Sequence, residues 1–163
     1  GAYNKLVESE PELAGELFGG LPYDFRGEQS EGGTPFYHVP VFSEHGDRLF
    51  VRYIRPYIEA SQGHDDAPRL SDGQRAAMEA YDAFIYDADN RVEMMFEPGD
   101  MQFVNNYHAL HGRKAYEDNP ETGDVRWLKR LWLATEILQP EDRPDRFQAA
   151  GATSHWSDKR TKA

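Results

Sequence analysis

Residues 98–133 carry the pattern that most constrains the fold of this chain. A Pro-Gly-Asp turn at 98–100 opens an apolar run, and from residue 126 the side chains alternate between two sets. The first set is Arg126, Leu128, Arg130 and Trp132, and the second is Trp127, Lys129, Leu131 and Leu133. Neighbouring residues of a strand point to opposite faces, and both sets contain large apolar groups. The pattern therefore predicts a strand that is covered on both sides.

Such a strand would direct Arg126 and Arg130 toward an interior. An interior arginine needs an acidic partner or an anionic ligand, because an unpaired buried charge is costly. Four residues of strand separate the two side chains by about 13 Å, so each arginine needs a partner of its own. Spacing alone leaves two alternatives open, which are structural ion pairs and anion-binding sites.

The order of motifs in this region resembles the C-terminal part of the taurine/2,4-D dioxygenase (TauD/TfdA) family. The shared elements are the Pro-Gly-Asp turn, Asn105-Asn106, the Leu-His-Gly-Arg stretch at 110–113, Arg126, and Arg130 followed by Leu-Trp-Leu. Members of that family are iron(II)- and 2-oxoglutarate-dependent oxygenases. A looser resemblance extends over residues 3–133.

The resemblance implies roles for three residues. His111 would be the second histidine of a two-histidine, one-carboxylate iron site, and Arg126 would hold the distal carboxylate of 2-oxoglutarate. Arg130 would meet the cosubstrate or an anionic group of the substrate. Imidazole suits iron(II), and a guanidinium matches a carboxylate with two parallel donors. No catalytic residue beyond the metal ligand is expected, and Asn105 and Asn106 are expected to satisfy backbone groups rather than to orient ligands.

The first histidine and the carboxylate of such a site have two local matches, and we interpret both as decoys. The His-Gly-Asp stretch at 45–47 lies in the predicted turn of a hairpin with strands at 36–42 and 48–54. The His-Asp-Asp stretch at 64–66 lies in a loop before a helix, where such residues are usually solvated. His38, His108 and His155 are expected to have structural or solvent-exposed roles.

We therefore expect this chain to be the C-terminal portion of a longer oxygenase. The implied fold is a β-rich α+β fold, with an incomplete double-stranded β-helix (jelly-roll, cupin-like) core and peripheral helices. Residues 1–138 would be the C-terminal part of the oxygenase domain, and residues 139–163 a polar tail. The implied reaction is hydroxylation of a small organic substrate, with decarboxylation of 2-oxoglutarate to succinate.

Two alternatives remain open. The chain could be a catalytically inactive fragment or binding module that keeps the fold but lacks the first iron-ligand motif. It could also hold a metal differently, through His45, Asp47 and His111, although a position at a hairpin tip would forbid that site. The substrate cannot be read from the sequence.

Composition limits the partners. With 29 acidic and 18 basic residues the net charge is -11, which disfavours binding to nucleic acid or to an anionic membrane. The chain has no cysteine, and no apolar stretch approaches the roughly 20 residues of a membrane span. A small-molecule substrate and a cytoplasmic location are the default expectations. Relatives are often homo-oligomers, so a homo-oligomer is one possible state here.

Local signals predict the remaining elements. Ser9 with Glu12, and Ser71 with Gln74, have the spacing of helix capping boxes. The second helix would bury Met78, Tyr81, Phe84 and Ile85 at helical spacing. Residues 24–35 are polar and glycine-rich, which predicts a long surface loop near a pocket. Val92, Met94 and Phe96 alternate as a strand would.

Overall fold

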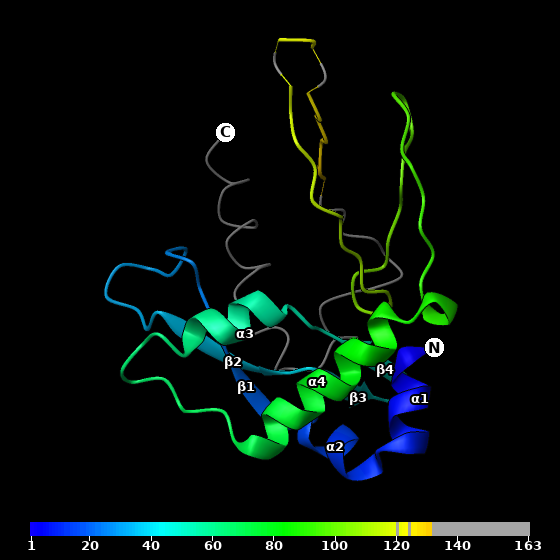
Figure 1. Ribbon diagram of the computed structural model, residues 1–163. Coiled ribbons are helices and arrows are strands. Elements are labelled where there is room, and N and C mark those ends of the chain that lie inside the picture. The colour runs from blue at the N-terminus through cyan, green and yellow to red at the C-terminus, as the bar shows by residue number, and fades with distance from the viewer. Residues whose placement is uncertain (120, 124, 132–163) are drawn as a thin grey trace.

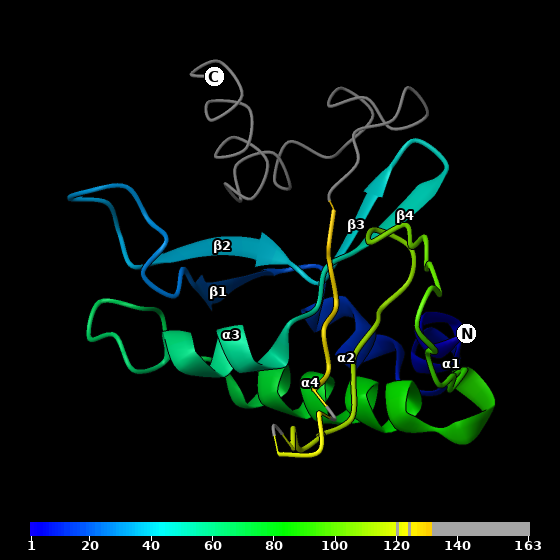
Figure 2. The same ribbon diagram turned by 90° about the horizontal axis from the view of Figure 1, so that it is seen from above.

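The computed structural model describes residues 1–119, 121–123 and 125–131, and its regular elements lie within the first 90 residues (Figure 1). The helices are α1 (Ala2–Ser9), α2 (Pro11–Glu16), α3 (Arg55–Ser61), α4 (Asp72–Tyr86) and the short 3-10 helix η1 (Ala88–Asn90). The strands are β1 (Gly20–Asp24), β2 (Phe36–Pro40), β3 (Phe42–His45) and β4 (Arg48–Val51). Figure 2 shows the strands on one side of α3 and α4.

The strands form two antiparallel pairs. β1 pairs with β2, so that Leu21 lies opposite Val39 and Tyr23 opposite Tyr37. β3 pairs with β4 in a hairpin with a two-residue turn, in which Gly46 has a φ of +63°. A positive φ at the first turn residue is typical of a type II′ turn, and glycine adopts it without strain. The predicted hairpin at 45–47 is therefore confirmed, but its first strand is shorter than predicted because residues 36–40 pair with β1 instead.

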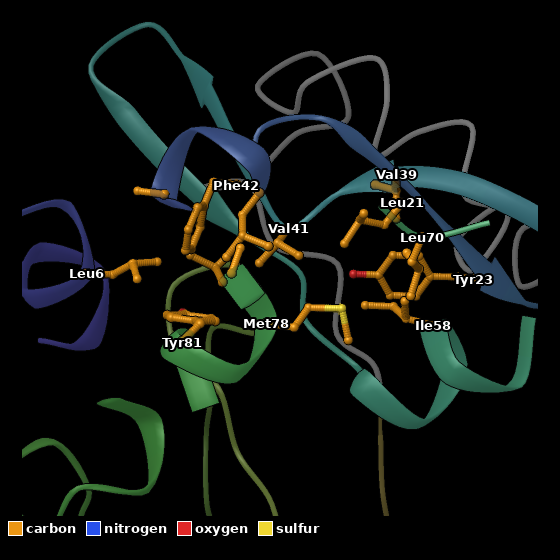
Figure 3. Close-up of a cluster of buried hydrophobic side chains, with 14 of the residues drawn as sticks. Leu6, Leu21, Tyr23, Val39, Val41, Phe42, Ile58, Leu70, Met78 and Tyr81 are labelled. Carbon is orange, nitrogen blue, oxygen red and sulfur yellow. The ribbon is translucent and has the colours of Figure 1, made fainter. Parts of the chain in front are cut away.

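A single apolar core joins the two sheets to the helices (Figure 3). Its largest fully buried apolar side chains are Tyr23, Phe42, Phe50, Leu6, Leu17, Leu21, Ile58, Met78, Val39 and Val41. Phe42 is central, since its ring contacts those of Tyr3, Phe18 and Tyr81 at centroid distances of 4.9, 5.6 and 5.0 Å. The core thus fixes the sheets relative to α1 and α4.

The capping signals had different outcomes. Ser71 caps α4 as predicted, because its Oγ accepts from the Gln74 backbone N–H at 3.0 Å and the Gln74 side chain accepts from the Ser71 N–H at 3.1 Å. The prediction that Ser9 caps the helix beginning near Pro11, which is α2, was wrong. Ser9 is the last residue of α1, a helix that was not predicted, and Glu10 precedes α2 without a side-chain cap.

The chain beyond η1 is extended but forms no continuous strand in the part that the structure describes. Figure 1 shows it extending away from the helices in two long segments, drawn in green and in yellow. We call them the first excursion (residues 92–104) and the second excursion (the described residues between 111 and 131). The turn predicted at 98–100 is present, since Asp100 N donates to Glu97 O at 3.0 Å and Gly99 has a φ of +103°. The strand predicted at 92–96 is not formed, nor is the described part, 126–131, of the strand predicted from 126, because a strand needs a neighbouring strand to accept its backbone hydrogen bonds.

The structure thus contains small antiparallel sheets and helices, and its described residues do not form a complete double-stranded β-helix. None of the helices in these residues combines the length and the apolar character that a membrane span requires. Residue 132 onward, with His155 and the predicted polar tail, lies outside the described residues.

Candidate functional site

His111 follows a short turn that is fixed to the end of β4. The backbone N–H of Val51 donates to Tyr107 O at 2.8 Å, and the Phe50 ring lies 5.8 Å from that of Tyr107. Beyond this anchor the chain becomes exposed, and His111 is on the exposed part. The sheet therefore positions the start of the His111 segment, and the imidazole lies in solvent.

Asn105 has the backbone role that the sequence predicted. Its Oδ1 accepts from the Tyr107 N–H at 3.1 Å, and its carbonyl oxygen accepts from the N–H groups of His108 and Ala109 at 3.0 Å each. These bonds shape the turn that precedes His111. His108 is exposed, and its ring contacts Phe50 at 5.6 Å, which agrees with a surface role.

Arg126 and Arg130 lie on the second excursion, and both are exposed. The Arg126 guanidinium lies 4.8 Å from the centre of the Tyr116 ring, and its backbone N–H donates to Asp118 Oδ1 at 2.8 Å. Trp127 is 81% exposed and Leu131 83%. The expectation that this strand is covered on both faces is therefore not met here, because no neighbouring strand of the described chain packs on it.

The stretches 45–47 and 64–66, which we did not expect to bind metal, have different environments. His45 is exposed beside the hairpin turn, as expected. His64 is not simply solvated, since its Nε2 lies 2.5 Å from Asp24 Oδ2 and its ring stacks on Phe36 at 6.2 Å. This contact ties the loop after α3 to the end of β1, so its role is structural.

No cluster of three or more potential metal ligands occurs within residues 1–119, 121–123 and 125–131. The alternative site made of His45, Asp47 and His111 is thus not formed by the structure. His111, Arg126 and Arg130 are the predicted site residues, and all three are exposed and make no hydrogen bond or ion pair with one another in the described part of the chain. Chemically, they supply one imidazole for a metal and two guanidiniums for carboxylates.

The sequence prediction missed one arginine with an unusual environment, Arg52, which directly follows β4. Its Nη2 donates to the hydroxyl of Tyr37 at 2.7 Å, and its own carbonyl accepts from Tyr23 Oη at 2.8 Å. The signal that could have revealed it is the two-residue period, because Arg52 follows the buried Phe50 by two positions.

Burial is the main influence on the pKa values of the two tyrosines beside Arg52. Burial raises the pKa of Tyr23 far above its usual range, against the lowering effect of Arg52. Burial likewise raises the pKa of Tyr37, although Arg52 acts to lower it. Both hydroxyls are therefore neutral near pH 7, and neither supplies a negative charge to the guanidinium.

Comparison with known proteins identifies a family. The family model described as "Taurine catabolism dioxygenase TauD, TfdA family" matches residues 1–132. The chain is 32% identical to FR-33289 synthase of Streptomyces rubellomurinus over 139 residues, which cover 82% of this chain and 40% of that protein.

Two further relatives are named as hydroxylases. Enduracididine beta-hydroxylase of Streptomyces hygroscopicus is 33% identical over 105 residues, which are 63% of this chain and 28% of the relative. L-ornithine/L-arginine 3-hydroxylase of Catenulispora acidiphila is 30% identical over 94 residues, which are 57% of this chain and 25% of the relative. The chain therefore spans well under half the length of each of these relatives.

Proposed function

We propose, from the premise that this chain belongs to the TauD/TfdA family, that it is the C-terminal part of an iron(II)- and 2-oxoglutarate-dependent oxygenase that hydroxylates a small organic substrate. The observation that carries the proposal is the retention of His111, Arg126 and Arg130 at their motif positions within the matched region. Hydroxylases among the relatives support the reaction type.

The residues present fit one of the three expected iron ligands and the arginines of the expected cosubstrate site. His111 would ligate iron(II), Arg126 would hold the distal carboxylate of 2-oxoglutarate, and Arg130 would meet the cosubstrate or an anionic substrate group. When bound, iron and cosubstrate would supply oxidising power, with 2-oxoglutarate converted to succinate and carbon dioxide. The first histidine and the carboxylate ligand would come from a segment of the parent protein outside this chain.

The same missing segment would complete the fold. Exposed apolar side chains on the excursions include Val92, Met94, Met95, Met101, Phe103, Trp127 and Leu131. In the parent protein these segments would pair with further strands of a jelly roll, which would cover the apolar groups and satisfy the backbone. Covering would also exclude water from the iron site and hold the two arginines against their carboxylates.

The test is an anaerobic titration of iron(II) with 2-oxoglutarate, followed by the weak visible charge-transfer band of the chelate. We expect the full-length parent to develop the band, the His111→Ala variant to lose it, and the Arg126→Ala variant to need a higher 2-oxoglutarate concentration. His45→Ala is the matched control, since it removes an exposed histidine from the hairpin tip and should leave the band unchanged.

This chain alone should give no band. A band in the His111→Ala parent would refute the assignment of that ligand. A parent that binds neither iron nor cosubstrate would instead favour the second candidate, a binding module that keeps the fold without catalysis. The specific observation on its side is that the described residues gather no three metal ligands.

A further inference from the structure

Arg52 is a partly buried cation, and its side chain makes one hydrogen bond among the described residues. A guanidinium carries five N–H donors. One donor of Arg52 reaches Tyr37 Oη at 2.7 Å, while Nε is fully buried and finds no acceptor among the described residues. The guanidinium lies 5.4 Å from the centre of the Tyr37 ring and 6.0 Å from that of Tyr23. Because these two rings stack on each other at 5.5 Å, the guanidinium lies beside the pair, and its Nε edge is left without a partner among the described residues.

The charge of Arg52 also lacks a counter-ion in the part of the chain that the structure describes. No carboxylate there makes an ion pair with it, although the protein carries 29 acidic residues. Arg55, three residues later, shows the usual arrangement, since it pairs with both Glu59 and Asp82. A partly buried guanidinium without an acid is costly, unless an anion occupies the place that the acid would take.

The backbone holds Arg52 at the junction of the two sheets. Its N–H donates to Val41 O at 2.8 Å, and its carbonyl accepts from the Tyr23 hydroxyl at 2.8 Å. The preceding residue, Val51, anchors the turn that leads to His111 through its bond to Tyr107 O. Arg52 is therefore a preorganised cation beside the start of the candidate iron-ligand segment.

The loop at 25–35 contacts Tyr37, the residue that holds the Arg52 guanidinium. The Phe25 ring contacts that of Tyr37 at 4.6 Å, and Glu28 acts electrostatically on the Tyr37 hydroxyl without forming an ion pair with Arg52. This is the loop whose composition predicted a position near a pocket. Its Gln29 Oε1 is the other buried side-chain polar atom that has no partner among the described residues.

We propose that Arg52, held in place by Tyr37, binds an oxyanion group of the substrate, either a carboxylate or a phosphorus oxyanion. The planar guanidinium carries Nε and a neighbouring nitrogen as a fork that can donate two parallel hydrogen bonds to two oxygens of such a group. Anion binding itself depends only on the residues described. Assigning the anion to the substrate rests on the proposed function, in which Arg126 takes the cosubstrate.

The test uses the metal-free 163-residue chain, so that its result is independent of iron binding. The Nε–Hε resonance of Arg52 is followed by nuclear magnetic resonance during titrations with acetate, inorganic phosphate and 2-oxoglutarate, at constant ionic strength set by chloride. We expect a saturable shift with acetate or with phosphate, and the ion that saturates first identifies the class of oxyanion. The wild-type titration needs no variant, so its result does not depend on how a substituted chain folds.

Two variants sharpen the result. Tyr37→Phe keeps the ring but frees the guanidinium, so it should weaken anion binding several-fold. Arg48→Gln removes an exposed arginine from the same hairpin and should leave binding unchanged. Unsaturable shifts with every ion would overturn the site. Tighter binding of 2-oxoglutarate than of acetate would reassign Arg52 to the cosubstrate and overturn the substrate assignment.

Discussion

Tyr23 couples the core to the Arg52 site through a single hydroxyl. The side chain is fully buried, its Oη donates to the Arg52 carbonyl at 2.8 Å, and burial raises its pKa. In the unfolded chain, Tyr23 loses its proton above about pH 10, whereas in the folded chain it keeps the proton. The unfolded state then binds fewer protons, so the free energy of unfolding is unaffected below this pH and falls as the pH rises above it.

The Tyr23→Phe variant tests this coupling. We expect it to lower the free energy of unfolding by about 1 kcal/mol near pH 7, because the hydrogen bond is lost. It should also make the decline above pH 10 less steep. Urea unfolding at a series of pH values measures both effects, and Tyr86→Phe is the control, since Tyr86 is 68% exposed. Equal alkaline slopes in wild type and Tyr23→Phe would contradict the assignment.

Phe42 is the side chain on which the core depends most. It is fully buried and its ring contacts three other aromatic rings, from α1, from the turn after α2 and from α4. Truncation in Phe42→Ala should lower the free energy of unfolding by about 3–5 kcal/mol, because it removes apolar burial and leaves a cavity. Denaturant unfolding measures the change. A loss below about 1 kcal/mol would mean that the aromatic cluster is not packed as described.

The start of α4 is set by a complete capping box, and the start of α2 is not. Ser71→Ala removes the acceptor of the Gln74 N–H and should lower the free energy of unfolding by about 1 kcal/mol. Ser9→Ala is a matched control, because Ser9 ends α1 and caps no helix. Thermal unfolding of the two variants distinguishes them. Equal losses would mean that the cap of α4 contributes nothing specific.

Elements with strong local signals were predictable, and elements that depend on distant partners were not. The hairpin turn at 45–47 and the cap of α4 are encoded within a few residues, and both were predicted. The pairing of β2 with β1 joins strands separated by an eleven-residue loop, 25–35, so nothing local reveals it. Residues 55–61 begin with Arg-Pro and form α3, which packs on β1, a contact visible only in three dimensions.

At the scale of the whole molecule, the described residues divide into a packed part and an extended part. Residues 1–90 hold the core and the regular elements, whereas residues 92–131 expose most of their large apolar side chains. We expect amide hydrogen exchange in this chain to be slow in the β1–β2 pair and in α4, and near the rate of an unstructured peptide at 92–104 and 111–119.

The same measurement on the full-length parent tests the proposed jelly roll. Exchange at 92–104 and 111–119 should slow strongly there, because added strands would accept the backbone N–H groups. The amides of β1 and β2 serve as an internal control, since they should be slow in both proteins. Rapid exchange of the excursions in the parent would mean that they do not join a larger sheet.

By itself, the sequence determined the family, because motifs such as the one at 110–113 are contiguous or closely spaced, and the roles of His111, Arg126 and Arg130 stay predictions. It also determined that the 45–47 stretch is a turn, since the turn depends on a glycine and its two polar neighbours and not on distant residues. Only the tertiary structure decided that His64 pairs with Asp24, that Arg52 lies beside two stacked tyrosines without an acid among the described residues, and that the described segments 92–96 and 126–131 form no strand. Each of these depends on which distant groups come within contact range, and burial and hydrogen bonding between segments far apart in the chain leave no local pattern.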